Sequence, residues 1–112
     1  MTGDDRALVD RFLDMMAAEA GASRHTLAAY RNDLERAAEG LGGHLGDAGP
    51  DGVATLGEQW RDLAPSTVAR RSAALRRFFG FLVDEGLRGD DPSAALPSPR
   101  FERRLPRILA AA

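Results

Sequence analysis

Arginine is the residue type in this sequence that is best suited to binding a ligand. All 15 basic residues are Arg, Cys is absent, and His25 and His44 are the only histidines. Four of the arginines fall within eight positions: Arg70, Arg71, Arg76 and Arg77. A guanidinium group binds a phosphate through parallel hydrogen bonds, so this cluster predicts contact with a polyanion such as duplex DNA.

Catalytic chemistry is not expected from these residues. Neither histidine has a nearby Ser or Asp in a pattern that would make a nucleophile and its base. The lack of Cys excludes disulfide scaffolds and Cys-ligated zinc sites, and no Walker loop or GxGxxG motif occurs. We therefore expect no metal, no cofactor and no small-molecule ligand.

The charge of the chain is unevenly distributed. The formal net charge of -2 argues mildly against nucleic-acid binding, because phosphate affinity comes from neutralising cations. However, residues 1–65 carry 6 Arg and 12 acids, whereas residues 66–112 carry 9 Arg and 5 acids. The basic second part is the one expected to meet phosphates.

Length and composition predict one globular, cytoplasmic domain. The chain has 112 residues, of which 44% are apolar. No apolar run approaches the roughly 20 residues that a membrane helix needs. The first residues, MTGDDR, are acidic where a signal peptide would be basic and then apolar. We expect no contact with a membrane.

The elements that position the arginines are predicted to be helices. Four segments have apolar residues at helical spacing and none alternates like a strand, which predicts an all-α fold. We expect helices at about 5–20, 24–41, 53–63 and 67–85. Ser23 should cap the second helix and Ser66 or Thr67 the fourth, after a break at Pro65. The five Gly of residues 42–52 predict a long loop there.

The end of the chain has a different composition. Residues 87–107 contain four Pro and five Arg, with room for one short helical turn at 92–96. This composition predicts a helical domain at 1–88, followed by an exit segment and linker at 89–112.

The apolar stripes also predict the core. They comprise Leu8, Val9, Phe12, Leu13, Met16, Leu27, Tyr30, Leu34, Ala38, Leu41, Val53, Leu56, Trp60, Leu63, Val68, Leu75, Phe78, Phe79 and Leu82. Phe81 lies off the stripe of its helix, so we expect it to dock against a neighbouring domain or the linker.

The fourth helix should present its arginines to solvent. At about 100° per residue, its apolar stripe centres between Leu75 and Phe79, and the opposite face carries Arg70, Ala73 and Arg77. No acid follows these arginines at the spacing of an intrahelical pair, so we expect them to be unpaired. A smooth cationic face of this kind suits a major groove, although a merely solvated basic face has the same sequence pattern.

The start of the second helix is a further candidate contact. Its polar residues could reach phosphates, and a helix N-terminus itself favours an anion. The acids further along this helix, Asp33, Glu35 and Glu39, are expected to pair within it, with Arg36 and its neighbours. The predicted DNA-binding residues are Arg24, His25, Thr26, Arg31, Arg70, Arg71, Arg76 and Arg77.

Several strings of the sequence resemble one family. They are S-R-H-T-L-A-A-Y-R-N-D-L (Ser23 to Leu34), A-R-R-S-A-A-L-R-R-F-F-G-F-L (Ala69 to Leu82), D-D-P-S-A-A-L-P-S-P-R (Asp90 to Arg100) and R-L-P (Arg104 to Pro106). Together they resemble the N-terminal core-binding domain of tyrosine recombinases, the phage integrase family. Within it the resemblance is to the Xer type, and to XerD-like members more than XerC-like ones.

The resemblance implies a SAM-like four-helix bundle that clamps one face of a recombination half-site. A separate C-terminal domain would clamp the other face and exchange the strands, and other protomers would complete a tetramer on the DNA. Arg70 and the Arg76-Arg77 pair match positions that face DNA in that family, and Thr26, Tyr30 and Arg31 match its second-helix surface. Ala73 stands where the family often has Ser. No strand cleavage is expected from these 112 residues, since the family's catalytic groups lie in the downstream domain.

A second interpretation belongs to another functional class. The acidic first helix could dock a partner protomer, which would make the domain a protein-interaction module without tight DNA binding of its own.

Overall fold

The computed structural model describes residues 1–96, whose helices are joined by loops and turns without a strand. The elements are α1 (Gly3–Glu19), α2 (Arg24–Gly40), α3 (Pro50–Gln59), the 3₁₀ turn η1 (Trp60–Asp62), α4 (Pro65–Asp84) and the 3₁₀ turn η2 (Pro92–Ala95). The predicted all-α class is confirmed.

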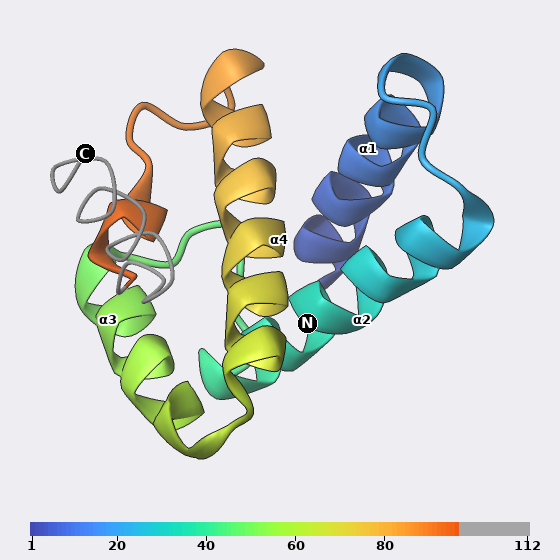
Figure 1. Cartoon of the computed structure of the whole chain (residues 1–112). Helices are drawn as coiled ribbons and strands as arrows, with labels where there is room; N and C mark the ends of the chain where they lie inside the picture. The colour runs from blue at the N-terminus through green and yellow to red at the C-terminus, as the bar shows by residue number, and fades with distance from the viewer. Residues whose placement is uncertain (97–112) are drawn as a thin grey trace, which may run out of the picture.

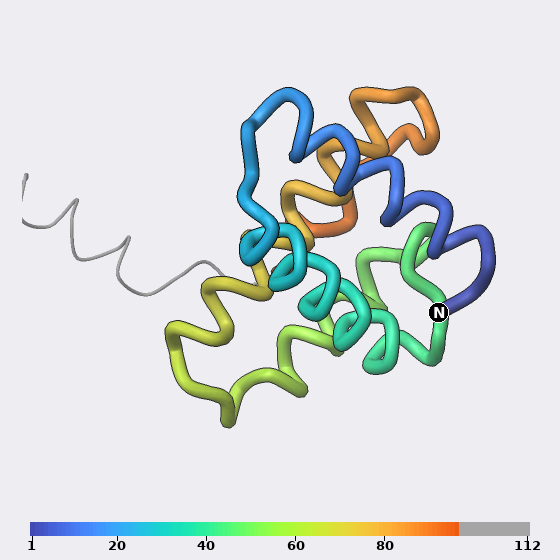
Figure 2. The backbone as a smooth tube through the Cα atoms, turned by 90° about the vertical axis from the view of Figure 1, so that its right-hand side faces the viewer, coloured from blue at the N-terminus to red at the C-terminus, as the bar shows by residue number. Residues whose placement is uncertain are grey.

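The longest helix, α4, stands at the centre of the domain. In Figure 1 it lies between α1 on one side and α3 on the other, while α2 runs obliquely across the lower half of the view. Figure 2, turned by 90°, shows α2 crossing the chain of α4, and these two helices make the most extensive helix–helix contact in the described chain. The turn η2 packs against both α3 and α4. The two helices predicted to carry the DNA-binding residues are thus direct neighbours.

The starts of the helices follow two different rules. Side chains cap α1 and α2: Thr2 accepts a hydrogen bond from the Asp5 N–H at 3.0 Å, and Ser23 accepts one from the Thr26 N–H at 3.2 Å. By contrast, α3 and α4 begin with a proline in their first turn and have no side-chain cap.

Two predictions about these starts are wrong. Pro65 begins α4, and Ala64 holds the N-cap position predicted for Ser66 or Thr67. The long loop likewise ends at Gly49, because Pro50 begins α3. A proline suits the first helical turn, where its fixed φ is already helical and its missing N–H has no partner to lose.

The ends of α1 and α4 lie where the sequence predicts them. Gly21 and Gly86 have φ of 65° and 71°, a left-handed conformation that glycine adopts without strain. The Leu87 N–H donates to the Leu82 carbonyl at 2.8 Å, which closes the last turn of α4. The third helix ends earlier than predicted, because residues 60–62 tighten into η1.

The core forms around Phe12, whose side chain is fully buried. Its ring meets those of Tyr30, Phe78 and Phe81 edge-on, at centroid distances of 6.0, 5.7 and 5.8 Å. The prediction that Phe81 docks outside the domain is therefore wrong: α1 covers that flank of α4, and only 7% of Phe81 is exposed. Leu63, predicted to be in the core, is 36% exposed because it follows the tightened turn η1.

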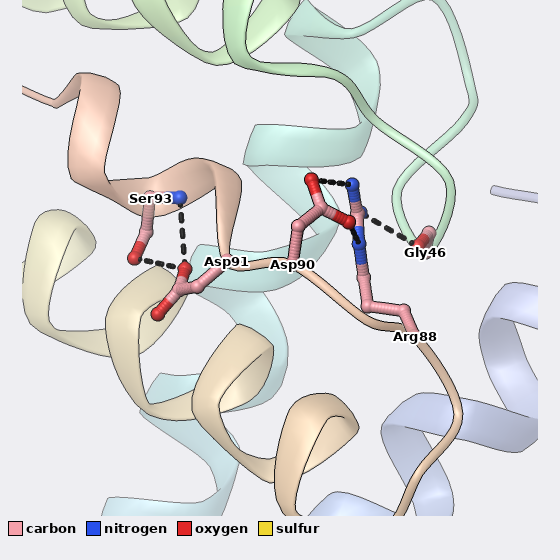
Figure 3. Close-up of polar contacts among 5 residues, drawn as sticks. All are labelled: Gly46, Arg88, Asp90, Asp91 and Ser93. Carbon is pink, nitrogen blue, oxygen red and sulfur yellow. Dashed lines mark hydrogen bonds and ion pairs between the residues drawn. The ribbon is translucent and has the colours of Figure 1, made fainter.

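The segment after α4 packs back onto the domain. Arg88 donates to the Gly46 carbonyl at 3.1 Å and to both carboxylate oxygens of Asp90 at 3.0 and 3.1 Å (Figure 3). The Asp91 carboxylate caps η2 by accepting the Ser93 N–H at 2.9 Å. Packing thus continues past the predicted boundary at residue 88. The remainder of the predicted linker, including Arg104 to Pro106, lies outside the described residues.

Residues 1–96 contain neither a membrane-spanning helix nor a cluster of metal ligands. No helix there combines the length and the apolar character that crossing a membrane requires. In the same part of the chain, His, Cys, Asp and Glu side chains nowhere gather in threes that could hold a metal ion.

Candidate nucleic-acid interface

The exposed face of α4 carries the residues that the helical spacing predicts. Arg70, Ala73 and Arg77 are exposed, while Ser72 and Leu75 on the other side of the helix are buried. Arg77 lies about 10 Å further along the helix axis than Arg70, since each residue advances the helix by about 1.5 Å. Two guanidinium groups with a methyl-sized side chain between them form a surface that another molecule can approach closely.

Arg70 has a carboxylate partner, contrary to the prediction. Its Nε donates to Asp33 Oδ2 at 3.1 Å, and its Nη2 donates to Asp33 Oδ1 at 3.0 Å. The Asp33 side chain is only 1% exposed, whereas that of Arg70 is 53% exposed. The spacing rule missed this pair because it finds partners only on the same helix, and Asp33 belongs to α2.

Arg71 also lies near the Asp33 carboxylate. Its Nε lies 4.0 Å from Asp33 Oδ1, and its guanidinium carbon lies 5.8 Å from the centre of the Trp60 ring. The side chain is 19% exposed, and its buried Nε has no hydrogen-bond partner within the described residues. Arg71 is therefore packed into the domain, and the prediction that the arginines of α4 are unpaired is wrong for Arg70 and Arg71.

Asp33, Arg70 and Arg71 together carry a net positive charge where α2 meets α4, because one carboxylate lies near two guanidinium groups. The hydrogen bonds that Arg70 donates to Asp33, followed by the negative charge of that carboxylate, raise the pKa of Arg70 above its ordinary value. Of the other two predicted arginines of α4, Arg76 is half-buried and Arg77 is exposed. Arg70 and Arg77 are thus the predicted contacts on α4 that are exposed to a ligand.

The first turn of α2 presents Arg24, His25 and Thr26 to solvent. The Ser23 hydroxyl caps this turn and also donates to Thr26 Oγ1 at 3.0 Å, so Thr26 is already part of the cap. No acid occurs in the turn, although the positive end of a helix dipole favours one. A cation at this position is electrostatically unfavourable in the free protein and becomes favourable beside a bound anion.

Arg31 faces a different neighbour. Its Nη2 donates to Asp10 Oδ1 of α1 at 2.8 Å, and both side chains are about half exposed. Arg36 pairs with Glu39 within α2, as predicted. The predicted residues are thus held by different contacts: Arg70 and Arg71 meet at Asp33, Arg31 pairs with Asp10 of α1, and the first turn of α2 is exposed.

Asp33 is the residue of this surface that sequence reasoning missed. A signal was present, because Asp33 falls on the apolar stripe of its helix, three residues after Tyr30 and adjacent to Leu34. An acid on a buried stripe requires a partner, since an unpaired buried charge is costly. The prediction that Asp33 pairs within its own helix is wrong.

Comparison with known proteins identifies the family. Residues 9–86 match the description "Phage integrase, N-terminal SAM-like domain". The chain belongs to the phage integrase family through this N-terminal SAM-like domain, and the resemblance drawn from the sequence strings is confirmed. No solved structure matches.

Individual relatives are Xer recombinases. Tyrosine recombinase XerC of Erythrobacter litoralis is 58% identical over 104 residues, which is 93% of this chain and 34% of that protein. Tyrosine recombinase XerD of Brucella suis is 43% identical over 109 residues, covering 91% of this chain and 35% of the relative. XerD of Caulobacter vibrioides is 44% identical over 108 residues, with coverage of 92% and 35%.

These comparisons support the Xer type, and the identities do not favour XerD-like members over XerC-like ones. The chain spans about a third of the length of these relatives. Together with the family match over residues 9–86, this coverage indicates that the chain corresponds to the N-terminal domain of these relatives.

Proposed function

We propose that this chain is the DNA-binding N-terminal domain of a site-specific tyrosine recombinase of the Xer type. It clamps one face of a recombination half-site through α2 and α4, in DNA integration or in the resolution of chromosome dimers before cell division. Duplex DNA and further protomers of the recombinase are its partners, and chromosomal DNA as substrate places its action in the cytoplasm.

The exposed face of α4 is the observation that carries this proposal. Arg70 and Arg77 are exposed on one face with only Ala73 between them. The major groove of B-DNA is about 12 Å wide and admits an α-helix whose flanking cations reach the phosphates on its rims. The acid-free first turn of α2, with exposed Arg24 and His25, supplies a second anion-binding element.

A salt titration tests the proposal. The 112-residue chain is titrated into a fluorescein-labelled duplex, and binding is followed by fluorescence anisotropy at several salt concentrations. With Arg24, Arg70 and Arg77 as phosphate contacts, we expect a log–log slope of about -3, because each contact contributes about -0.9. Arg77→Ala should weaken binding and reduce the slope by about one.

The matched control removes an arginine elsewhere. Arg11 of α1 pairs with Glu85 at 3.4 Å and is about half exposed. Arg11→Ala changes the net charge of the chain by the same amount as Arg77→Ala, and it should leave the slope unchanged. Equal effects of the two substitutions would contradict a specific role for the face of α4.

A second candidate function is assembly with another protomer. A groove between α1 and α2 is lined by Leu13, Ala17 and Leu27, with Asp14, Arg31 and Glu35 beside them. Its apolar lining favours a contact with an apolar segment of a partner. A chain that serves only this role would self-associate in light scattering and give no saturable anisotropy change with DNA at low salt.

A further inference from the structure

A buried carboxylate stands directly beneath the proposed DNA-binding face. Asp33 is 1% exposed, and its two oxygens accept hydrogen bonds from Nε and Nη2 of Arg70 at 3.1 and 3.0 Å. Arg71 contributes its charge at 4.0 Å and is itself packed on Trp60. The carboxylate therefore lies between two cations, and its hydrogen bonds hold the Arg70 guanidinium in place.

The pairing leaves part of the guanidinium group available. A guanidinium has five N–H groups, and the two that face Asp33 lie along one edge of its plane. The remaining three belong to a side chain that is 53% exposed. A free arginine on a helix surface samples many rotamers, whereas this one is held with its unused N–H groups in a defined direction.

We propose that Asp33 is a positioning residue for DNA binding: it holds Arg70 so that the outer N–H groups of the guanidinium meet a phosphate. This inference rests on the function proposed above and names a residue that acts through another. On this proposal Asp33 strengthens DNA binding although it adds a negative charge near the phosphates.

Simple electrostatics and positioning predict opposite signs for one substitution. Asp33→Asn removes a negative charge from the interface, so Coulomb attraction alone would tighten DNA binding. It also removes the two-oxygen acceptor that fixes Arg70, so positioning predicts weaker binding. We expect the 112-residue chain with Asp33→Asn to bind a fluorescein-labelled duplex about tenfold more weakly at low salt. Equal or tighter binding would overturn the proposal.

Arg70→Lys tests the same claim in a variant that keeps Asp33 and the charge on α4. Lysine is a point charge that cannot span both carboxylate oxygens in a fixed plane. We expect weaker binding, by about fivefold, with the salt slope of the unchanged chain. Arg70→Lys also tests the positioning role of Asp33 if circular dichroism shows that Asp33→Asn does not fold. Affinity equal to that of the unchanged chain would contradict a positioning role.

A double-mutant cycle separates positioning from general structural damage. If Asp33 acts through Arg70, Asp33→Asn should weaken binding in the unchanged chain and have no weakening effect in an Arg70→Ala background. A loss of equal size in both backgrounds would show that Asp33 acts through the fold instead, and the proposal would fail.

The two proposals fail in different ways. If the unchanged chain gives no saturable binding to the duplex at low salt, the proposed DNA-binding function fails and this inference fails with it. If the unchanged chain binds and Asp33→Asn binds equally well or better, only the role of Asp33 is refuted.

Discussion

Arg88 lies over the ring of Phe79, with its guanidinium carbon 5.4 Å from the ring centroid. The same group donates to the Gly46 carbonyl and to Asp90, and its side chain is only 14% exposed. Arg88 thereby joins three parts of the chain: α4, the loop before α3, and the segment that leads to η2. This contact fixes the direction in which the chain leaves α4.

Replacing Arg88 should loosen the segment at 89–96. Arg88→Ala removes the ring contact and the hydrogen bonds to Gly46 and Asp90, and we expect a loss of about 1–2 kcal/mol in the free energy of unfolding. Amide hydrogen exchange should accelerate at Leu96, whose N–H donates to the Ser93 carbonyl at 3.0 Å. Arg77→Ala, at an exposed position, is the control. Unchanged exchange at Leu96 would show that η2 is held by its apolar contacts alone.

Asp5 should be a major determinant of stability. Its carboxylate is buried and accepts the N–H groups of Leu45 and Gly46 at 2.8 and 2.9 Å. Asp5→Asn leaves one of these buried donors facing an amide NH₂, which costs about 1–3 kcal/mol. Urea unfolding measures the change. Asp4→Asn, at the exposed neighbouring position, should shift the midpoint little; equal shifts would contradict a specific role for Asp5.

The same carboxylate predicts how stability depends on pH. Burial raises the pKa of Asp5, but the hydrogen bonds from Gly46, Leu45 and Thr2 together outweigh it and lower the pKa below the ordinary value. The resulting stabilisation is fully present above the unfolded-state pKa of about 4 and is lost as pH falls through the lower folded-state pKa. The urea midpoint of the unchanged chain should therefore fall more steeply in this acid range than that of Asp5→Asn. Parallel curves would contradict the assignment.

Phe12 is the most sensitive apolar position that the structure indicates. Because three other rings surround it, Phe12→Ala would leave a cavity and cost about 3–5 kcal/mol. Phe12→Leu keeps much of the volume and should cost about 1–2 kcal/mol. Thermal unfolding followed by circular dichroism checks both values. Leu63→Ala, at a partly exposed position, should cost less than either; a similar cost would mean that Phe12 is not central.

The main features of the fold were predictable because they depend on nearby residues. Apolar spacing places Val9, Phe12, Leu34, Leu75 and Phe78 in the core, and each is fully buried. The glycines that end α1 and α4 could be predicted too, since the left-handed conformation that ends a helix depends on the residue type at that one position. The errors at Pro65 and at Pro50 are also local: a proline was interpreted as a break where it begins a helix.

The sequence alone determined the helices, their buried faces and the resemblance to a family, since periodicity and motif spacing are properties of neighbouring residues. Only the tertiary structure decided the partners of the buried charges. Asp33 meets Arg70 across 37 residues, and Asp5 meets Leu45 across 40. A side chain at either position is polar in a place where the helical pattern predicts an apolar one, and the carboxylate is tolerated there because a distant donor reaches it. These long-range hydrogen bonds depend on how whole helices pack against one another, and a local sequence pattern does not specify that packing.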